Sequence, residues 1–136
     1  MKVSIMQPYF LPYIGYFQLL NISDKFIIFD DVNYINKGWI DRNRINVNNK
    51  DFFFKIPLEK KSQNLKINEI KIINDNTWKK KLLKTLSYNY KNAPHYESIS
   101  NLIEDILFYN EKNLSRFIKN SLLKLIKFMN IECEIS

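Results

Sequence analysis

The fold is decided by residues 2–31, which read KVSIMQPYFLPYIGYFQLLNISDKFIIFDD. An apolar run that stops at Gln7 predicts a first buried strand, and Lys25–Phe29 predicts a second. Between them, Pro12–Asn21 predicts a short helix, because proline is tolerated in a first helical turn. Strand, helix and strand in this order predict a right-handed βαβ unit, with its loops at the carboxyl ends of the strands.

Downstream of this unit, the pattern predicts a hairpin and then helices. Ile45–Val47 and Phe52–Ile56 flank an Asn-Asn-Lys turn, which is typical of a β-hairpin, and Glu69–Ile73 predicts a further strand. Apolar residues then recur at helical spacing in three stretches, followed by a strand-like tail. These stretches are Thr77–Tyr90, Tyr96–Tyr109, a helix from Asn113 or Ser115 to Met129, and the tail Ile131–Ser136.

The predicted fold class is therefore α/β: a small Rossmann-like parallel sheet with a βαβ start, a β-hairpin insertion and C-terminal helices. A chain of 136 residues with 46% apolar residues builds one core, so we expect a single domain over residues 1–136. One cysteine, Cys133, allows no internal disulfide and favours a reducing compartment. No apolar run approaches the ~20 residues of a membrane span, and no signal-peptide pattern is present, so we expect a cytoplasmic protein without a membrane span.

The net charge of +7 arises mainly in residues 51–92. Of the 21 basic residues, 18 are lysine, in a chain that is also rich in Ile, Asn, Tyr and Phe. Such a composition is typical of an AT-rich coding bias. Compositional drift therefore explains the excess better than a nucleic-acid partner does.

The first candidate site is the proline corner, by which we mean residues 7–17. A turn that enters a helix at the edge of a parallel sheet presents backbone N–H groups to an anionic ligand. Gly15 permits close approach of a ligand, and the tyrosines offer hydroxyls and flat faces for a base or sugar ring. The alternative is a rigid corner packed with aromatic rings. The candidate binding residues here are Gln7, Pro8, Tyr9, Pro12, Gly15 and Tyr16.

The second candidate site follows the second strand. Adjacent carboxylates at Asp30 and Asp31 could hold Mg²⁺ together with a phosphorylated substrate, or one could act as a general base. Arg42 and Arg44 would point the same way in an extended segment and form a fork for phosphate. The alternatives are a strand-ending cap and a surface ion pair of Asp41 with Arg44. Asn33, Lys37 and Asn43 complete the candidate binding residues. We expect the proline corner and the two arginines to face a common cleft.

Three segments together resemble the WbqC-like family of bacterial proteins. They are MQPYFLPYIGYF at 6–17, FIIFDDVNY at 26–34 and GWIDRNRI at 38–45, and the resemblance continues through WKKKLL and NAPHY. By this resemblance, the family's signature positions are Gln7, Pro8, Tyr9, Pro12, Gly15, Tyr16, Asp30, Asp31, Lys37, Arg42, Asn43 and Arg44. Relatives usually continue into a further Gly-rich α/β portion. If that portion carries part of the site, this chain is shortened or needs a partner.

The resemblance implies a role in surface polysaccharide or O-antigen biosynthesis, with a sugar nucleotide as the small-molecule partner. We expect a transferase that places an acyl or aminoacyl group on a nucleotide-linked amino sugar. A non-catalytic module that binds a nucleotide sugar is the first alternative. The second is a nucleotidyltransferase-like enzyme, although Tyr13-Ile-Gly-Tyr16 stands where such enzymes carry a His-x-Gly-His box. The sequence leaves the cofactor, the metal dependence and the oligomeric state open.

Overall fold

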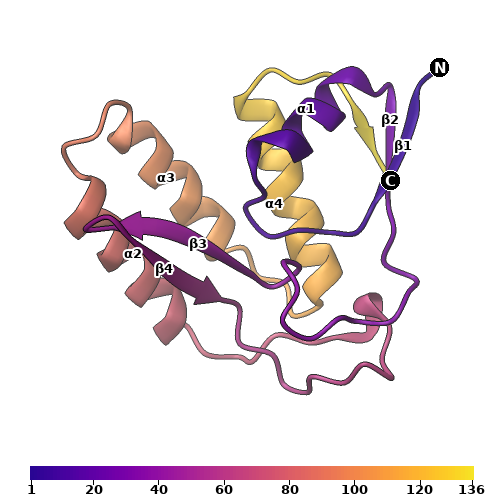
Figure 1. Ribbon diagram of the computed structural model, residues 1–136, viewed down its shortest axis with the longest axis horizontal. Coiled ribbons are helices and arrows are strands. Elements are labelled where there is room, and N and C mark those ends of the chain that lie inside the picture. The colour runs from indigo at the N-terminus through magenta and orange to yellow at the C-terminus, as the bar shows by residue number, and fades with distance from the viewer.

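A three-stranded parallel sheet forms one side of the molecule in the computed structural model, which describes all 136 residues (Figure 1). The sheet contains β1 (Val3–Met6), β2 (Lys25–Ile28) and β5 (Glu134–Ile135), in the order β1-β2-β5. Helix α1 (Ile14–Ile22) connects β1 to β2, which confirms the predicted βαβ unit. The strand-like tail is also confirmed, because β5 pairs in parallel with β2. Both chain ends therefore lie at this sheet (Figure 1).

The predicted hairpin is present, and its strands are longer than the pattern indicated. They are β3 (Arg42–Val47) and β4 (Lys50–Lys55), paired antiparallel. The turn uses only Asn48 and Asn49, whose φ angles are 52° and 60°. Two successive residues with positive φ make the two-residue hairpin turn that matches strand twist, and asparagine tolerates this backbone. Lys50 therefore belongs to the strand and not to the turn.

The strand predicted at Glu69–Ile73 is wrong. A short 3-10 helix, η1 (Ile67–Glu69), begins this region, and the rest is extended. Its neighbours are not strands: Lys71 makes an isolated bridge to Asn113, just before the last helix, and Ile72 makes one to Leu58. A continuous ladder needs an extended partner along its whole length, and none is available here.

The three predicted helices are present and end close to the predicted residues: α2 (Thr77–Tyr90), α3 (Tyr96–Leu107) and α4 (Leu114–Phe128). Asn113 caps α4, because its side chain accepts a hydrogen bond from the backbone N–H of Arg116. At the start of α2 the carboxylate of Asp75, and not Asn76, accepts from the backbone N–H and hydroxyl of Thr77. No helix has the length and apolar character that a membrane crossing requires.

Phe10 lies at the centre of the core, where the parts of the chain meet. Its ring is fully buried and packs against Phe54 of β4, Trp78 of α2 and Phe117 of α4, with ring centroids 5.9–6.4 Å apart. Edge-to-face and tilted pairs of this kind contribute about 0.5–1.5 kcal/mol each beyond the area that they bury. The proline corner is therefore attached through one side chain to the hairpin and to two helices.

Replacing Phe10 with alanine should lower the free energy of unfolding by about 3–5 kcal/mol, because a large cavity opens where three elements meet. Urea denaturation followed by circular dichroism measures the change. Tyr13→Ala is the matched control: its ring is 65% exposed, and we expect a loss of about 0.5 kcal/mol or less. Equal losses for the two variants would contradict the central role of Phe10.

Candidate functional site

The proline corner and the hairpin are joined by hydrogen bonds at Phe10 and Leu11. The side-chain amide of Asn43 donates to the carbonyl oxygen of Leu11 at 2.5 Å and to that of Phe10 at 3.3 Å. The backbone N–H of Phe10 donates to the carbonyl of Ile40 at 3.0 Å. Leu11 has a φ of 47°, a strained value for a leucine, and this turn directs its carbonyl to Asn43. Asn43 is therefore a structural link whose amide donors are already in use.

An open hollow of about 340 Å³ lies beside this link, and we call it the aromatic hollow. The proline corner supplies one wall, and the start of the hairpin with the loop before it supplies the other. Its lining residues are Tyr9, Pro12, Tyr13, Trp39, Asn43 and Arg44. The proline corner and Arg44 thus face a common cleft, whereas Arg42, which was expected there as well, does not line it.

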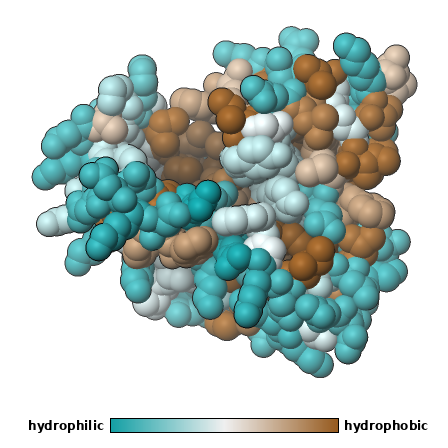
Figure 2. Space-filling model, viewed as in Figure 1, coloured by the Kyte–Doolittle hydropathy of each residue, from teal (hydrophilic) through white to brown (hydrophobic).

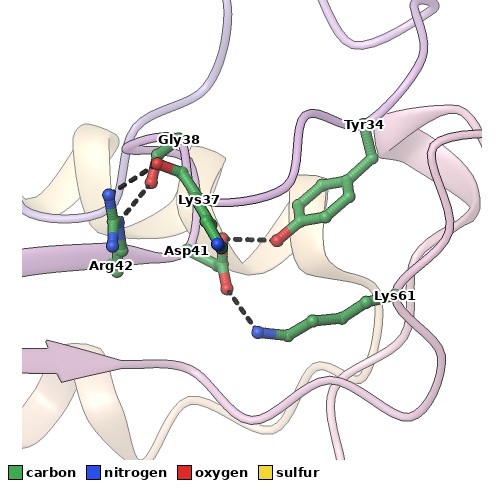
Figure 3. A network of polar contacts seen from close by, with 6 residues as sticks. All are labelled: Tyr34, Lys37, Gly38, Asp41, Arg42 and Lys61. Atoms are coloured by element: carbon green, nitrogen blue, oxygen red, sulfur yellow. Dashed lines mark hydrogen bonds and ion pairs between the residues drawn. The ribbon is translucent and has the colours of Figure 1, made fainter.

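Arg42 and Arg44 lie on the same side of the hairpin, but they have different surroundings. Both guanidinium groups lie over the ring of Trp39, at 5.1 Å and 5.8 Å from its centroid. Arg42 donates from Nε to the carbonyl of Gly38 at 2.8 Å and from Nη2 to the carbonyl of Lys37 at 2.5 Å (Figure 3). Arg44 is half exposed, and only Arg44 of the two lines the hollow. Arg42 therefore positions Trp39, and Arg44 is the guanidinium that faces the hollow.

Trp39 is held by residues of both hairpin strands. Its ring stacks on Phe53 of β4, with the centroids 6.3 Å apart and the planes inclined by 20°. Arg42 also lies over the Phe53 ring, at 5.6 Å. Stacking and cation–π contact fix a large ring that would otherwise be free in a surface loop. The hollow therefore has a rigid aromatic wall.

Asp41, which the alternative interpretation of the sequence placed in a surface ion pair, is a buried carboxylate. Only 3% of its surface is exposed; it accepts a hydrogen bond from the Tyr34 hydroxyl at 2.8 Å and pairs with Lys61 at 3.7 Å (Figure 3). Burial, and then the hydrogen bond to Asp41, raises the pKa of Tyr34 well above its ordinary value. The proposed ion pair of Asp41 with Arg44 is wrong, because Arg44 pairs with Asp51 on the neighbouring strand at 2.9 Å. Asp41 anchors the loop before the hairpin.

Asp30 and Asp31 lie beyond the end of β2 and outside the hollow's lining. Asp30 accepts a hydrogen bond from the hydroxyl of Ser115 in the first turn of α4, and Asp31 forms an ion pair with Lys66. No group of three or more His, Cys, Asp or Glu side chains is arranged to hold a metal ion. In this structure the two carboxylates join β2 to α4 and to the segment that precedes η1.

The remaining predicted binding residues divide between core and surface. Tyr16 is buried and donates its hydroxyl to the carbonyl of Gln7 at 2.8 Å; burial, with a contribution from Tyr9, raises its pKa far above the ordinary value. A Cβ at Gly15 would collide with the ring of Tyr13, so glycine makes room for that ring. The others lie outside the hollow: Pro8 is buried, Asn33 bridges to Lys66, and Lys37 is exposed, with a φ of 60°.

Comparison with known proteins agrees with the family resemblance that the sequence motifs indicated. The chain belongs to the WbqC-like protein family, whose sequence profile matches residues 7–136. An uncharacterized protein of Mycobacterium tuberculosis (strain ATCC 25618 / H37Rv), Rv1507c, is 30% identical over 137 residues. The match covers 99% of this chain and 59% of that relative, so the chain spans about three fifths of the relative's length. No solved structure matches the chain significantly.

Replacing Arg42 with alanine should release Trp39 while leaving the fold intact. In a Trp78→Phe background Trp39 is the sole tryptophan, and acrylamide should quench its fluorescence more strongly in the variant because the ring loses a stacking partner. We expect a stability loss of about 1–2 kcal/mol. Arg42→Lys should protect Trp39 from quenching little better than Arg42→Ala does, because an ammonium lacks the planar guanidinium that stacks on the ring. Lys50→Ala, an exposed hairpin change, is the control, and unchanged quenching in Arg42→Ala would exclude the positioning role.

Stability should fall in alkaline solution because of Tyr34. The folded state keeps the proton on this hydroxyl to higher pH than the unfolded state does. The contribution of Tyr34 to the free energy of unfolding is therefore complete below the ordinary tyrosine pKa of about 10. It is lost as the pH rises further. Urea unfolding at pH values from about 8 to about 11 should show a shallower decline for Tyr34→Phe than for the parent chain. Tyr88→Phe, at a residue 83% exposed, should decline like the parent; a decline in Tyr34→Phe as steep as the parent's would refute the assignment.

Proposed function

We propose that the aromatic hollow binds a nucleotide-linked amino sugar and that the protein acts in bacterial surface polysaccharide biosynthesis as an acyl- or aminoacyltransferase on that sugar. The observation that carries this proposal is the meeting of three aromatic side chains with one half-exposed guanidinium in a single hollow. Aromatic faces suit a base or a sugar ring, and a guanidinium suits a diphosphate. Membership of the WbqC-like family supports the biosynthetic role.

In this proposal the chain acts mainly by positioning. Arg44 faces the diphosphate, and Tyr13 and Trp39 contact the base or sugar ring. The amine nitrogen of the sugar attacks the acyl carbonyl carbon, so a C–N bond forms. The bond from that carbon to the donor's leaving group breaks, and the leaving group departs with the proton that the nitrogen loses. Holding the two reactants together supplies much of the acceleration in such a transfer.

A second candidate is a module that binds a nucleotide sugar without chemistry. It is favoured by the positions of Asp30 and Asp31, whose carboxylates are engaged outside the hollow. The lining offers phenol, indole and guanidinium groups, which bind and orient ligands. Nucleotidyl transfer is less well supported, because the hydroxyl of Tyr16 turns inward to Gln7 where the related enzymes place a histidine.

Ligand binding can be tested by thermal shift and calorimetry with UDP- and dTDP-linked amino sugars, with and without Mg²⁺. A specific ligand should raise the melting temperature by mass action. Trp39→Ala and Arg44→Gln should each weaken binding about tenfold or more, because each removes one recognition group. Tyr88→Ala, at an exposed position of α2, is the control. No shift with any sugar nucleotide, or wild-type affinity in Trp39→Ala, would refute the proposal.

A second measurement separates the enzyme from the binding module. The protein is incubated with an amino-sugar nucleotide and an acyl thioester, and the acylated sugar nucleotide is followed by mass spectrometry. Product that forms in the parent chain and is reduced in Arg44→Gln supports the transferase. Tight binding without product favours the module.

A further inference from the structure

A second cavity, which we call the apolar chamber, opens beside the aromatic hollow. It has a volume of about 610 Å³, within the usual range for small-molecule sites, and lies between the hairpin and helices α2 and α3. In Figure 2 the surface is hollowed between α3 and the start of α1, with hydrophobic atoms at the bottom of the recess. Its apolar walls come chiefly from Ile45, Phe54, Leu82, Leu86, Ile99 and Ile103.

The chamber exists because the hairpin is attached to the helices at two separate places. At the hairpin tip, the hydroxyl of Tyr90 on α2 donates to the carbonyl of Asn46 on β3. At the other end, Phe54 packs on Phe10, which in turn packs on Trp78 of α2. Between these attachments the apolar faces of the helices stay uncovered, and Ile99 keeps 40% of its surface exposed.

The polar end of the chamber is its junction with the aromatic hollow. Pro12, Tyr13, Asn43 and Arg44 line both cavities. No carboxylate lines the chamber, and Arg44 is its single charged lining residue. The pairing of Arg44 with Asp51 is exposed on both sides, and exposed pairs are weak enough to be exchanged for a ligand's anionic or carbonyl oxygen. An apolar cavity with one cation at its mouth fits a chain that carries one polar end.

We propose that the apolar chamber binds the hydrocarbon chain of a fatty-acyl donor, with the carboxyl-derived end of that chain at Arg44 and Tyr13. The inference rests on the proposed function, and it selects an acyl group over an aminoacyl group as the group transferred. In an aminoacyl donor the α-ammonium is one carbon from the carbonyl, so it would lie beside the Arg44 guanidinium, a like charge, with no carboxylate in the lining to pair with it. The sugar in the hollow and the acyl carbonyl would then meet at the residues that the two cavities share.

Isothermal titration of the full chain with saturated carboxylates, from acetate to dodecanoate and below micelle-forming concentrations, tests the chamber directly. Each added methylene should tighten binding about fourfold until the chamber is full, after which affinity should level off. Decanol should bind more weakly than decanoate in the parent chain and equally in Arg44→Gln. No dependence on chain length would overturn the proposal.

Two variants separate this proposal from the proposed function. Ile99→Trp fills the chamber from a partly exposed wall position, so decanoate binding should fall about tenfold or more while sugar-nucleotide binding is kept. Trp39→Ala should weaken the sugar nucleotide and leave decanoate unchanged. Leu123→Trp on α4, at a residue 42% exposed and outside the chamber, is the control.

The outcomes distinguish the two proposals. Decanoate that binds the parent and the Ile99→Trp variant equally refutes the chamber and leaves the sugar-nucleotide site standing. Decanoate binding without any sugar-nucleotide binding refutes the hollow alone. If Ile99→Trp changes the sedimentation coefficient of the protein and not its affinity for decanoate, the chamber is an interface between copies of the chain and the acyl proposal fails.

Discussion

The structure depends on the burial of one phenylalanine ring at the end of the proline corner. Phe10 packs against β4, α2 and α4, and its backbone N–H and carbonyl are both bonded to residues at the start of the hairpin. Hydrophobic burial supplies the stabilisation, and the hydrogen bonds to Ile40 and Asn43 set the orientation. The hairpin would otherwise be a two-stranded ribbon, which is marginally stable alone.

Both cavities follow from this attachment. The hydrogen bonds of Asn43 hold the corner against β3, so Tyr9 and Tyr13 come to lie opposite Trp39 and Arg44. On the other side of the same residues, the hairpin spans α2 and α3 and leaves the apolar chamber between them. Recognition groups for a polar ligand and for an apolar one thus share a common wall.

Most of the conspicuous charges near the candidate site hold backbone or side chains in place. Arg42 binds the carbonyls of residues 37 and 38, Asp30 binds Ser115, and Asp41 is buried against Tyr34 and Lys61. A buried or half-buried charge must be paired, and these pairs attach the loop segments that follow β2 or precede β3. Arg44 differs, because it is half exposed and faces both cavities.

Local pattern predicted the elements well where spacing and capping decide them. The βαβ start, the hairpin and the bounds of α2 depend on apolar periodicity, on proline and on asparagine turns, which act within a few residues. The strand at Glu69–Ile73 failed because strand formation needs a partner that lies far away in the sequence. At the start of α2, Asp75 and Asn76 both suit the capping role by type, and the sequence alone does not decide that Asp75 accepts the hydrogen bonds of Thr77.

The sequence by itself determined the α/β class and the family, because those follow from local pattern and from motifs. Tertiary structure alone decided which members of each motif are available to a ligand. Tyr16 and Arg42 donate hydrogen bonds to backbone carbonyls, whereas Tyr13 and Arg44 face the cavities. Side chains two or three residues apart have different surroundings once the chain is folded. The chamber itself could not be predicted from the sequence. The apolar residues of α2 and α3 that line it have the same helical spacing as residues that pack in an ordinary core.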